Sequence, residues 1–401
     1  DRGIEATELH LAATTLRNAS GALRADERIA VLSRGSLDNT AGLITSLGEV
    51  MLVDTQADRT LSLTNDGGTV SAGQSLQIQA DRLTGTGRIV SGGDASIALD
   101  ASLIHTGQMA AANTLQLTLG GSLDNRGRIE AANQLHLHAT GLDNRASGEI
   151  IGQDAHIDVA GALTNRGLID GASVHGQAHT LHNLGSGRIY GDRLSLQAGT
   201  LTNDTETLDG VRADAVIAAR ERLDIGAATL VNRERALLFS AGDMALGGTL
   251  DANRRATGSA SLIHNASATI EALGNADIAA SLLRNTNEHV EIGYQAGQPV
   301  RRVIHRVGSA EYDNAAVAYT RFWGSREGQH LYLVPDQQYF DQGHPLGEVG
   351  DKYLLLPSST YPLNTFGPAG VLDHVPLAAY VPPGTGMFHD STYEIPEVYR
   401  Y

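Results

Sequence analysis

The sequence predicts an all-β chain in two parts: a parallel β-helix over residues 1–294, and a region of short strands and loops over residues 295–401. Three observations predict this. A Leu-x-Asn unit recurs about every 20 residues, each unit contains short stretches that alternate apolar and polar residues, and proline and aromatic residues are concentrated after the repeats end. A fixed period of this length is typical of solenoid proteins.

Thirteen Leu-x-Asn units, or near variants, follow one another along the first part. Nine of the twelve spacings between them lie between 18 and 21 residues. The long spacings follow Leu37, Leu201 and Leu230, and we expect surface insertions there, because an insertion must leave the core path intact. Two units lack the asparagine and read Leu83-Thr84-Gly85 and Leu103-Ile104-His105. The units begin at Leu16, Leu37, Leu63, Leu83, Leu103, Leu123, Leu142, Leu163, Leu181, Leu201, Leu230, Ile263 and Leu283.

Each unit predicts short strands with one buried face. The segments 76–79, 115–119 and 135–138 alternate apolar and polar residues with a period of two. Regular Asn-Gly or Asp-Gly hairpin turns do not separate these segments. Each strand is therefore expected to pair with the equivalent strand one repeat later, about 4.8 Å away. In this arrangement Leu117 and Leu137 point inward and stack.

The recurrent asparagine predicts a turn and a ladder. Asn tolerates left-handed backbone conformations and bonds nearby backbone groups, which suits the position where the chain leaves a strand. In stacked coils its amide can also bond the amides of its neighbours. A structural role is favoured over a functional one.

The repeat resembles the haemagglutinin repeat of filamentous haemagglutinins and contact-dependent inhibition proteins, the exoproteins of two-partner secretion. The resemblance covers residues 1–292 and rests on the Leu-x-Asn series and on segments 237–246, 267–272 and 283–289. It implies a right-handed β-helix exported through an outer-membrane partner. The first residues already look like the middle of a repeat, so we expect a fragment of a longer protein. The secretion domain that would recognise this transporter is not in the sequence.

The second part differs sharply in composition. All ten prolines lie at or after Pro299, as do most tyrosines and the only tryptophan. Short apolar runs over 300–304, 331–334, 353–356 and 377–381 predict short antiparallel strands packed against the last coils, because prolines exclude long helices. By its position in the chain, this region resembles the receptor-recognising region of contact-dependent inhibition proteins.

The densest aromatic stretch supplies the candidate receptor-binding residues. Aromatic residues and arginine dominate binding hot spots, although the same residues could form a small local core. The candidates are Tyr312, Tyr319, Arg321, Phe322, Trp323, Arg326, Tyr332, Tyr339 and Phe340.

Catalytic, cofactor and metal sites are not predicted. Acidic residues are spread singly, and Asp124 and Asp143 recur at one repeat position, where a solvated turn accounts for them. His136 and His138 share one outward strand face as a possible metal pair, but no third ligand recurs nearby. Phosphate loops, Gly-x-Ser-x-Gly elbows and cysteine nucleophiles are missing.

The net charge of −16 with scattered basic residues argues against nucleic-acid binding. The resemblance implies a secreted or cell-surface stalk, without enzymatic activity, whose non-repeat region binds an outer-membrane protein or glycan on a neighbouring bacterium. The alternatives are a host-cell adhesin of the same architecture and a polysaccharide-acting β-helix enzyme.

Overall fold

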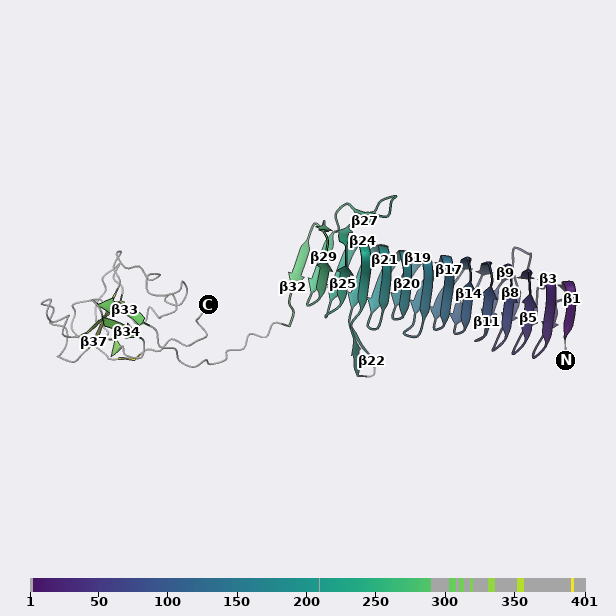
Figure 1. Cartoon of the computed structure of the whole chain (residues 1–401), viewed down its shortest axis with the longest axis horizontal. Coiled ribbons are helices and arrows are strands. Elements are labelled where there is room, and N and C mark those ends of the chain that lie inside the picture. The colour runs from purple at the N-terminus through teal and green to yellow at the C-terminus, as the bar shows by residue number, and fades with distance from the viewer. Residues whose placement is uncertain are drawn as a thin grey trace. The chain divides into compact units, whose positions relative to one another are not determined.

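The computed structural model describes residues 3–208 and 210–289, together with the backbone of six short strands beyond residue 302. The chain divides into two compact units, Asp1–Val290 and Glu291–Tyr401. The first unit is a parallel β-helix, in which each turn of the chain lies on the previous turn (Figure 1). The described residues contain no helix. The predicted fold class is confirmed.

Each turn has three strand positions, so the rod has three faces. Face 1 carries the Leu-x-Asn units, in β2 (Thr15–Arg17), β4 (Ser36–Asp38), β7 (Ser62–Thr64), β10 (Arg82–Thr84), β13 (Leu103–His105), β16 (Ser122–Asn125), β18 (Gly141–Asn144), β29 (Leu262–Ala266) and β32 (Leu283–Thr286). Face 2 follows, in β5 (Leu43–Ser46), β8 (Thr69–Ala72), β11 (Arg88–Ser91), β14 (Gln108–Ala111), β25 (Leu237–Ser240) and β30 (Thr269–Ala272). Face 3 completes the turn, in β6 (Glu49–Val53), β9 (Ser75–Ala80), β12 (Asp94–Leu99), β15 (Thr114–Leu119), β26 (Asp243–Gly247) and β31 (Ala276–Ile278).

Several strands continue around a corner from one face to the next. Three of them combine two faces: β1 (Ile4–Ala12), β3 (Ala22–Leu32) and β17 (Arg128–Ala139). Four others run along all three faces: β19 (Glu149–Asn165), β20 (Leu168–Leu184), β21 (Arg188–Asp204) and β24 (Val216–Arg233). The middle of the rod is therefore its most regular part.

The core is a stack of inward aliphatic side chains along the rod axis. Leu117 pairs in register with Leu137 on the next coil, and both are buried. Along β15 the inward leucines alternate with more exposed polar residues, as the period of two predicts. The predicted inward register is confirmed.

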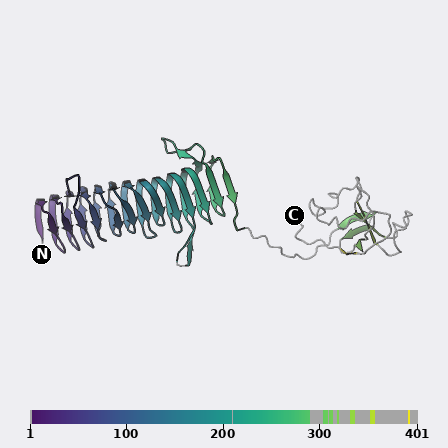
Figure 2. The ribbon, with the colours of Figure 1, turned by 180° about the vertical axis from the view of Figure 1, so that it is seen from behind.

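All three long spacings correspond to surface insertions. The first is the loop over residues 54–61 between β6 and β7. The second is an antiparallel hairpin of β22 (Glu206–Leu208) and β23 (Val211–Ala213). The third is the hairpin of β27 (Thr249–Leu250) and β28 (Ala256–Thr257). The two hairpins leave the rod on different sides, as both views show (Figures 1 and 2).

In the second unit the structure describes six short strands. They pair antiparallel as β33 (Val303–Val307) with β34 (Ala310–Asp313), β35 (Ala318–Tyr319) with β38 (Ser391–Thr392), and β36 (Leu331–Pro335) with β37 (Lys352–Leu356). Three of the four predicted apolar runs thus overlap strands. The fourth, residues 377–381, lies outside the described residues.

Candidate functional site

The predicted receptor-binding residues all fall in the second unit. Tyr312 belongs to β34, Tyr319 to β35 and Tyr332 to β36. The other six lie outside the described residues: Arg321, Phe322, Trp323, Arg326, Tyr339 and Phe340. Their role in recognition stays a prediction.

On the rod, the asparagines of face 1 form a hydrogen-bonded ladder that is buried from Asn18 to Asn232. The amide nitrogen of Asn144 donates to Oδ1 of Asn165 at 2.7 Å, and Asn165 donates to Asn183 at 2.8 Å. Most of these amides also donate to a backbone carbonyl further on, as Asn144 does to Leu168 at 3.2 Å. The ladder runs through Asn18, Asn39 and Asn65, and then through Asn125, Asn144, Asn165, Asn183, Asn203, Asn232, Asn265 and Asn285.

The ladder asparagines do not adopt the left-handed conformation that this residue type tolerates. The positive-φ residues lie two positions later, as at Ser20 (φ 55°), Ala41 (φ 51°) and Gly185 (φ 55°). The asparagine ends a strand with its amide directed inward, and the following residues make the corner. Its hydrogen-bonding capacity, rather than its backbone tolerance, explains its recurrence.

The ladder is interrupted at the two units that lack the asparagine. Gly85 occupies one position with φ 110°, and His105 occupies the next. His105 is 3% exposed and its Nε2 lies 3.2 Å from the Arg128 carbonyl. Strand pairing on face 1 also breaks here: β10 ends a four-stranded sheet, and pairing resumes between β13 and β16.

The recurrent aspartates belong to an ion-pair network outside the ladder. Asp124 contacts Arg126 at 2.9 Å and Arg145 at 3.0 Å, and Asp143 contacts Arg145 at 3.0 Å. Hydrogen bonding to Arg126, supported by Arg145, lowers the pKa of Asp124 to about 2. The interpretation of Asp124 as a solvated turn residue is therefore wrong, because its side chain is only 20% exposed and is paired with arginine.

Face 3 carries a column of three histidines that is not apparent in any single repeat. The strand register places His136 beside His156, and His156 beside His175. Their ring centroids are 5.2 and 5.6 Å apart, and Nδ1 of His175 lies 3.2 Å from the Ser195 hydroxyl. The sequence analysis considered only the pair His136 and His138 on one strand and did not predict this column across three coils. The spacings of 20 and 19 residues are the available sequence signal, and they appear only when the repeats are aligned.

The β27–β28 hairpin folds back over this face. Gln197 Oε1 accepts from the Leu250 amide at 2.6 Å, and Asp224 Oδ1 accepts from the Ala256 amide at 3.0 Å. The hairpin approaches closely because Gly226 has no side chain, and a Cβ there would overlap the Thr249 backbone. The hairpin tip then reaches the histidine column.

Arg254 at the tip makes the contact with the largest separation in sequence. Its guanidinium lies 2.6 Å from Nε2 of His156, a residue 98 positions away in sequence. Burial lowers the pKa of His156, and the nearby Arg254 charge lowers it further. The same two causes, in the same order, lower the pKa of His175. Both imidazoles are therefore neutral at neutral pH.

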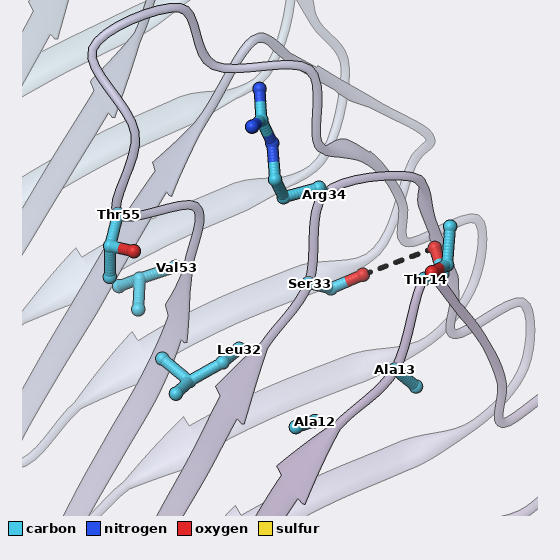
Figure 3. A pocket seen from close by; sticks show the side chains of 8 residues that line it. All are labelled: Ala12, Ala13, Thr14, Leu32, Ser33, Arg34, Val53 and Thr55. Atoms are coloured by element: carbon cyan, nitrogen blue, oxygen red, sulfur yellow. Dashed lines mark hydrogen bonds between the residues drawn. The ribbon is translucent and has the colours of Figure 1, made fainter.

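An open hollow lies at the corner of the first coils, beside the first insertion (Figure 3). Ser33 donates to the Thr14 carbonyl at 3.4 Å across its floor. Arg34 is the one charged lining residue, and Asp58 already contacts it at 3.3 Å. The lining therefore offers no acid–base pair. It consists of Ala12, Ala13, Thr14, Leu32, Ser33, Arg34, Val53 and Thr55.

Two further searches gave negative results. Among the described side chains, no group of three or more histidine, cysteine or carboxylate ligands is arranged to hold a metal ion. The described part of the chain also has no helix of the length and apolarity needed to span a bilayer.

A long stack of parallel coils, joined along one face by a hydrogen-bonded asparagine ladder, defines a β-solenoid stalk. The haemagglutinin-repeat model matches residues 4–49, 52–127, 110–167, 171–243 and 216–304. The chain therefore belongs to the haemagglutinin-repeat family and is a filamentous haemagglutinin-like protein. Proteins with this repeat are typically non-enzymatic adhesins or stalks, and are generally secreted or surface-exposed. No curated protein and no solved structure matches the chain.

Proposed function

We propose that this chain is part of a contact-dependent growth inhibition exoprotein, with residues 1–294 as its stalk and residues 295–401 as its receptor-binding region. The exoprotein reaches the cell surface by two-partner secretion and recognises an outer-membrane protein or glycan on a neighbouring bacterium. The observation that carries this proposal is the difference in sequence between the two parts of the chain. A regular family rod precedes a region that holds the only tryptophan and most tyrosines.

The rod itself favours a spacer role. The ladder amides are used up between coils, and the carboxylates Asp124 and Asp143 are paired with arginines. Aromatic residues, which supply much of the energy of interfaces, are scarce on the rod and frequent after residue 299. Binding energy is therefore expected mainly from the second part.

A host-cell adhesin is the second candidate function, and family membership favours it equally. The two differ in the target cell, so binding of the labelled chain to Gram-negative bacteria and to cultured epithelial cells separates them. Binding to bacteria that is lost on removal of one outer-membrane component supports the first function. Binding to epithelial cells alone supports the second.

The placement of recognition is tested within the full chain. Replacing Tyr319, Phe322 and Trp323 by alanine should weaken target-cell binding at least tenfold. A matched variant, Ile104→Ser, removes an apolar side chain that is 61% exposed on the rod and should bind normally. Full-strength binding by the triple variant, or by a folded chain truncated after Gln298, would place recognition on the repeats.

A further inference from the structure

The contact between Arg254 and His156 joins an insertion to the body of the rod. The tip that presents Arg254 is ordered by Asp251, whose carboxylate accepts from the amides of Asn253 and Arg255, both at 2.8 Å. Arg254 has a left-handed backbone (φ 60°), which is uncommon for a residue with a side chain. The tip therefore holds the guanidinium in a defined direction, toward the histidine column.

This contact requires a neutral histidine. A guanidinium has donors and no acceptor, so Nε2 of His156 must accept the hydrogen bond, and the imidazole proton must be on Nδ1. Protonation of Nε2 removes the acceptor lone pair. It also places two positive charges at hydrogen-bonding distance, where the hairpin partly excludes water. Neutral His156 therefore favours a tip that is docked on face 3, and protonated His156 favours a tip that is detached from it.

Some neighbours of the histidine column oppose protonation of its imidazoles, and others favour it. Arg254 on the hairpin and the imidazole of His136 on β17 oppose protonation of His156. Arg254 and His156 likewise oppose protonation of His175 on β20. Asp154 on β19, 3.7 Å from His156, favours protonation. Asp158, also on β19, favours protonation of His175, although it is paired with His138 of β17 at 3.1 Å. The Ser195 hydroxyl of β21 bonds His175 and carries no charge.

We propose that the β27–β28 hairpin is an acid-released strap: at neutral pH Arg254 holds its tip on His156, and protonation of His156 detaches the tip from face 3. The base of the hairpin stays attached through Gln197 and Asp224, because these bonds do not depend on a histidine. Detachment uncovers His156 and His175, which are only partly exposed while the hairpin is closed. The protonated imidazole of His156 then faces the solvent beside the exposed His136.

The direction of the switch follows from the pKa shift. Burial and Arg254 lower the pKa of His156 below its ordinary value of 6.5, so the histidine stays neutral through the neutral range. The strap is therefore closed at neutral pH and above, and it opens as the pH falls through the lowered pKa of His156. The hairpin tip is therefore expected to detach only in acidic solution.

The distance between two spin labels can follow the tip. The chain contains no cysteine, so Ser96→Cys and Asn253→Cys introduce the only labelling sites. Ser96 is exposed in the same column, three strands before His156, or about 14 Å along the rod. We expect a narrow distance distribution at pH 7.5, and a longer, broader one at pH 5. Histidine-selective ¹⁵N spectra of the full chain report the protonation of Nε2 in parallel.

Three variants separate the strap from general acid effects. His156→Gln keeps an acceptor that does not titrate, so the distribution should stay narrow at both pH values. His156→Arg should release the tip already at pH 7.5. His138→Gln, which alters an exposed histidine paired with Asp158 instead of Arg254, should leave the wild-type response unchanged.

Circular dichroism at both pH values verifies that the rod remains folded. The proposal is overturned if the tip stays in place while His156 is protonated. It is equally overturned if His156 is still neutral at pH 5, or if the His156→Gln variant opens as the wild type does.

Discussion

At the scale of single residues, the rod depends on its inward side chains. Leu137 is 2% exposed and is stacked on Leu117. We predict that Leu137→Asp lowers the free energy of unfolding by several kcal/mol, because it buries an unpaired charge. Circular dichroism melts measure the effect, and Gln116→Asp, an outward change on the neighbouring coil, is the control. An unchanged melting temperature in Leu137→Asp would contradict the assigned core.

His105 makes the stability of the rod depend on pH. Burial lowers the pKa of His105 below 6.5, so the unfolded chain takes up a proton at a higher pH than the folded chain does. The stability associated with this group is complete above pH 6.5 and is lost as the pH falls through the lowered pKa. We predict a lower melting temperature at pH 5.5 than at pH 8, and a smaller difference in His105→Asn.

The comparison with Gly85 sharpens this prediction. Gly85→Asn restores the same consensus residue, but φ is 110° there and a Cβ would overlap the Asn65 backbone. This variant should therefore be destabilised at both pH values. If His105→Asn retains the full pH dependence, partly exposed histidines with a lowered pKa, such as His175, are responsible for it.

At the scale of structural elements, the asparagine ladder stabilises face 1. Asn165 accepts from Asn144 and donates to Asn183, and it is fully buried. We predict that Asn165→Ala costs about 2–3 kcal/mol, because it leaves buried polar groups without partners. Denaturant unfolding measures this. The matched variant is Asn285→Ala at the exposed end of the ladder, for which we expect a change within about 0.5 kcal/mol.

Insertions are less constrained in sequence than the coils of the rod. Each coil is fixed by its neighbours, so an insertion needs only to leave the strand register unchanged. The register confirms this, because Leu37 still pairs with Leu63, and Leu201 with Leu230. The sequence predicts where the chain leaves the rod but carries no periodic signal for where an insertion docks, as the β27–β28 hairpin demonstrates.

At the scale of the whole rod, stability is a sum of interactions between neighbouring coils. The weakest link on face 1 is between β10 and β13, where both the ladder and the strand pairing break. We predict that native-state hydrogen exchange in rising denaturant separates the coils before residue 85 from those after residue 122. A single exchange transition for the whole rod would show that faces 2 and 3 alone couple the two blocks.

The sequence by itself determined the solenoid, its inward register and the positions of its insertions. These follow from a period of about 20 residues and from the alternation of apolar and polar residues, which are local in the chain. Receptor recognition by residues 295–401 remains a prediction from composition and resemblance, because the described part of the structure does not test it.

Only the tertiary structure decided which outward side chains meet. His136, His156 and His175 are neighbours because successive coils stack, and Arg254 joins them because its hairpin folds back by several coils. Asp124 is likewise held by an arginine of the next coil. Stacking converts a separation of 20 residues along the chain into one of about 5 Å in space. Side-chain chemistry that no single repeat contains therefore arises between coils.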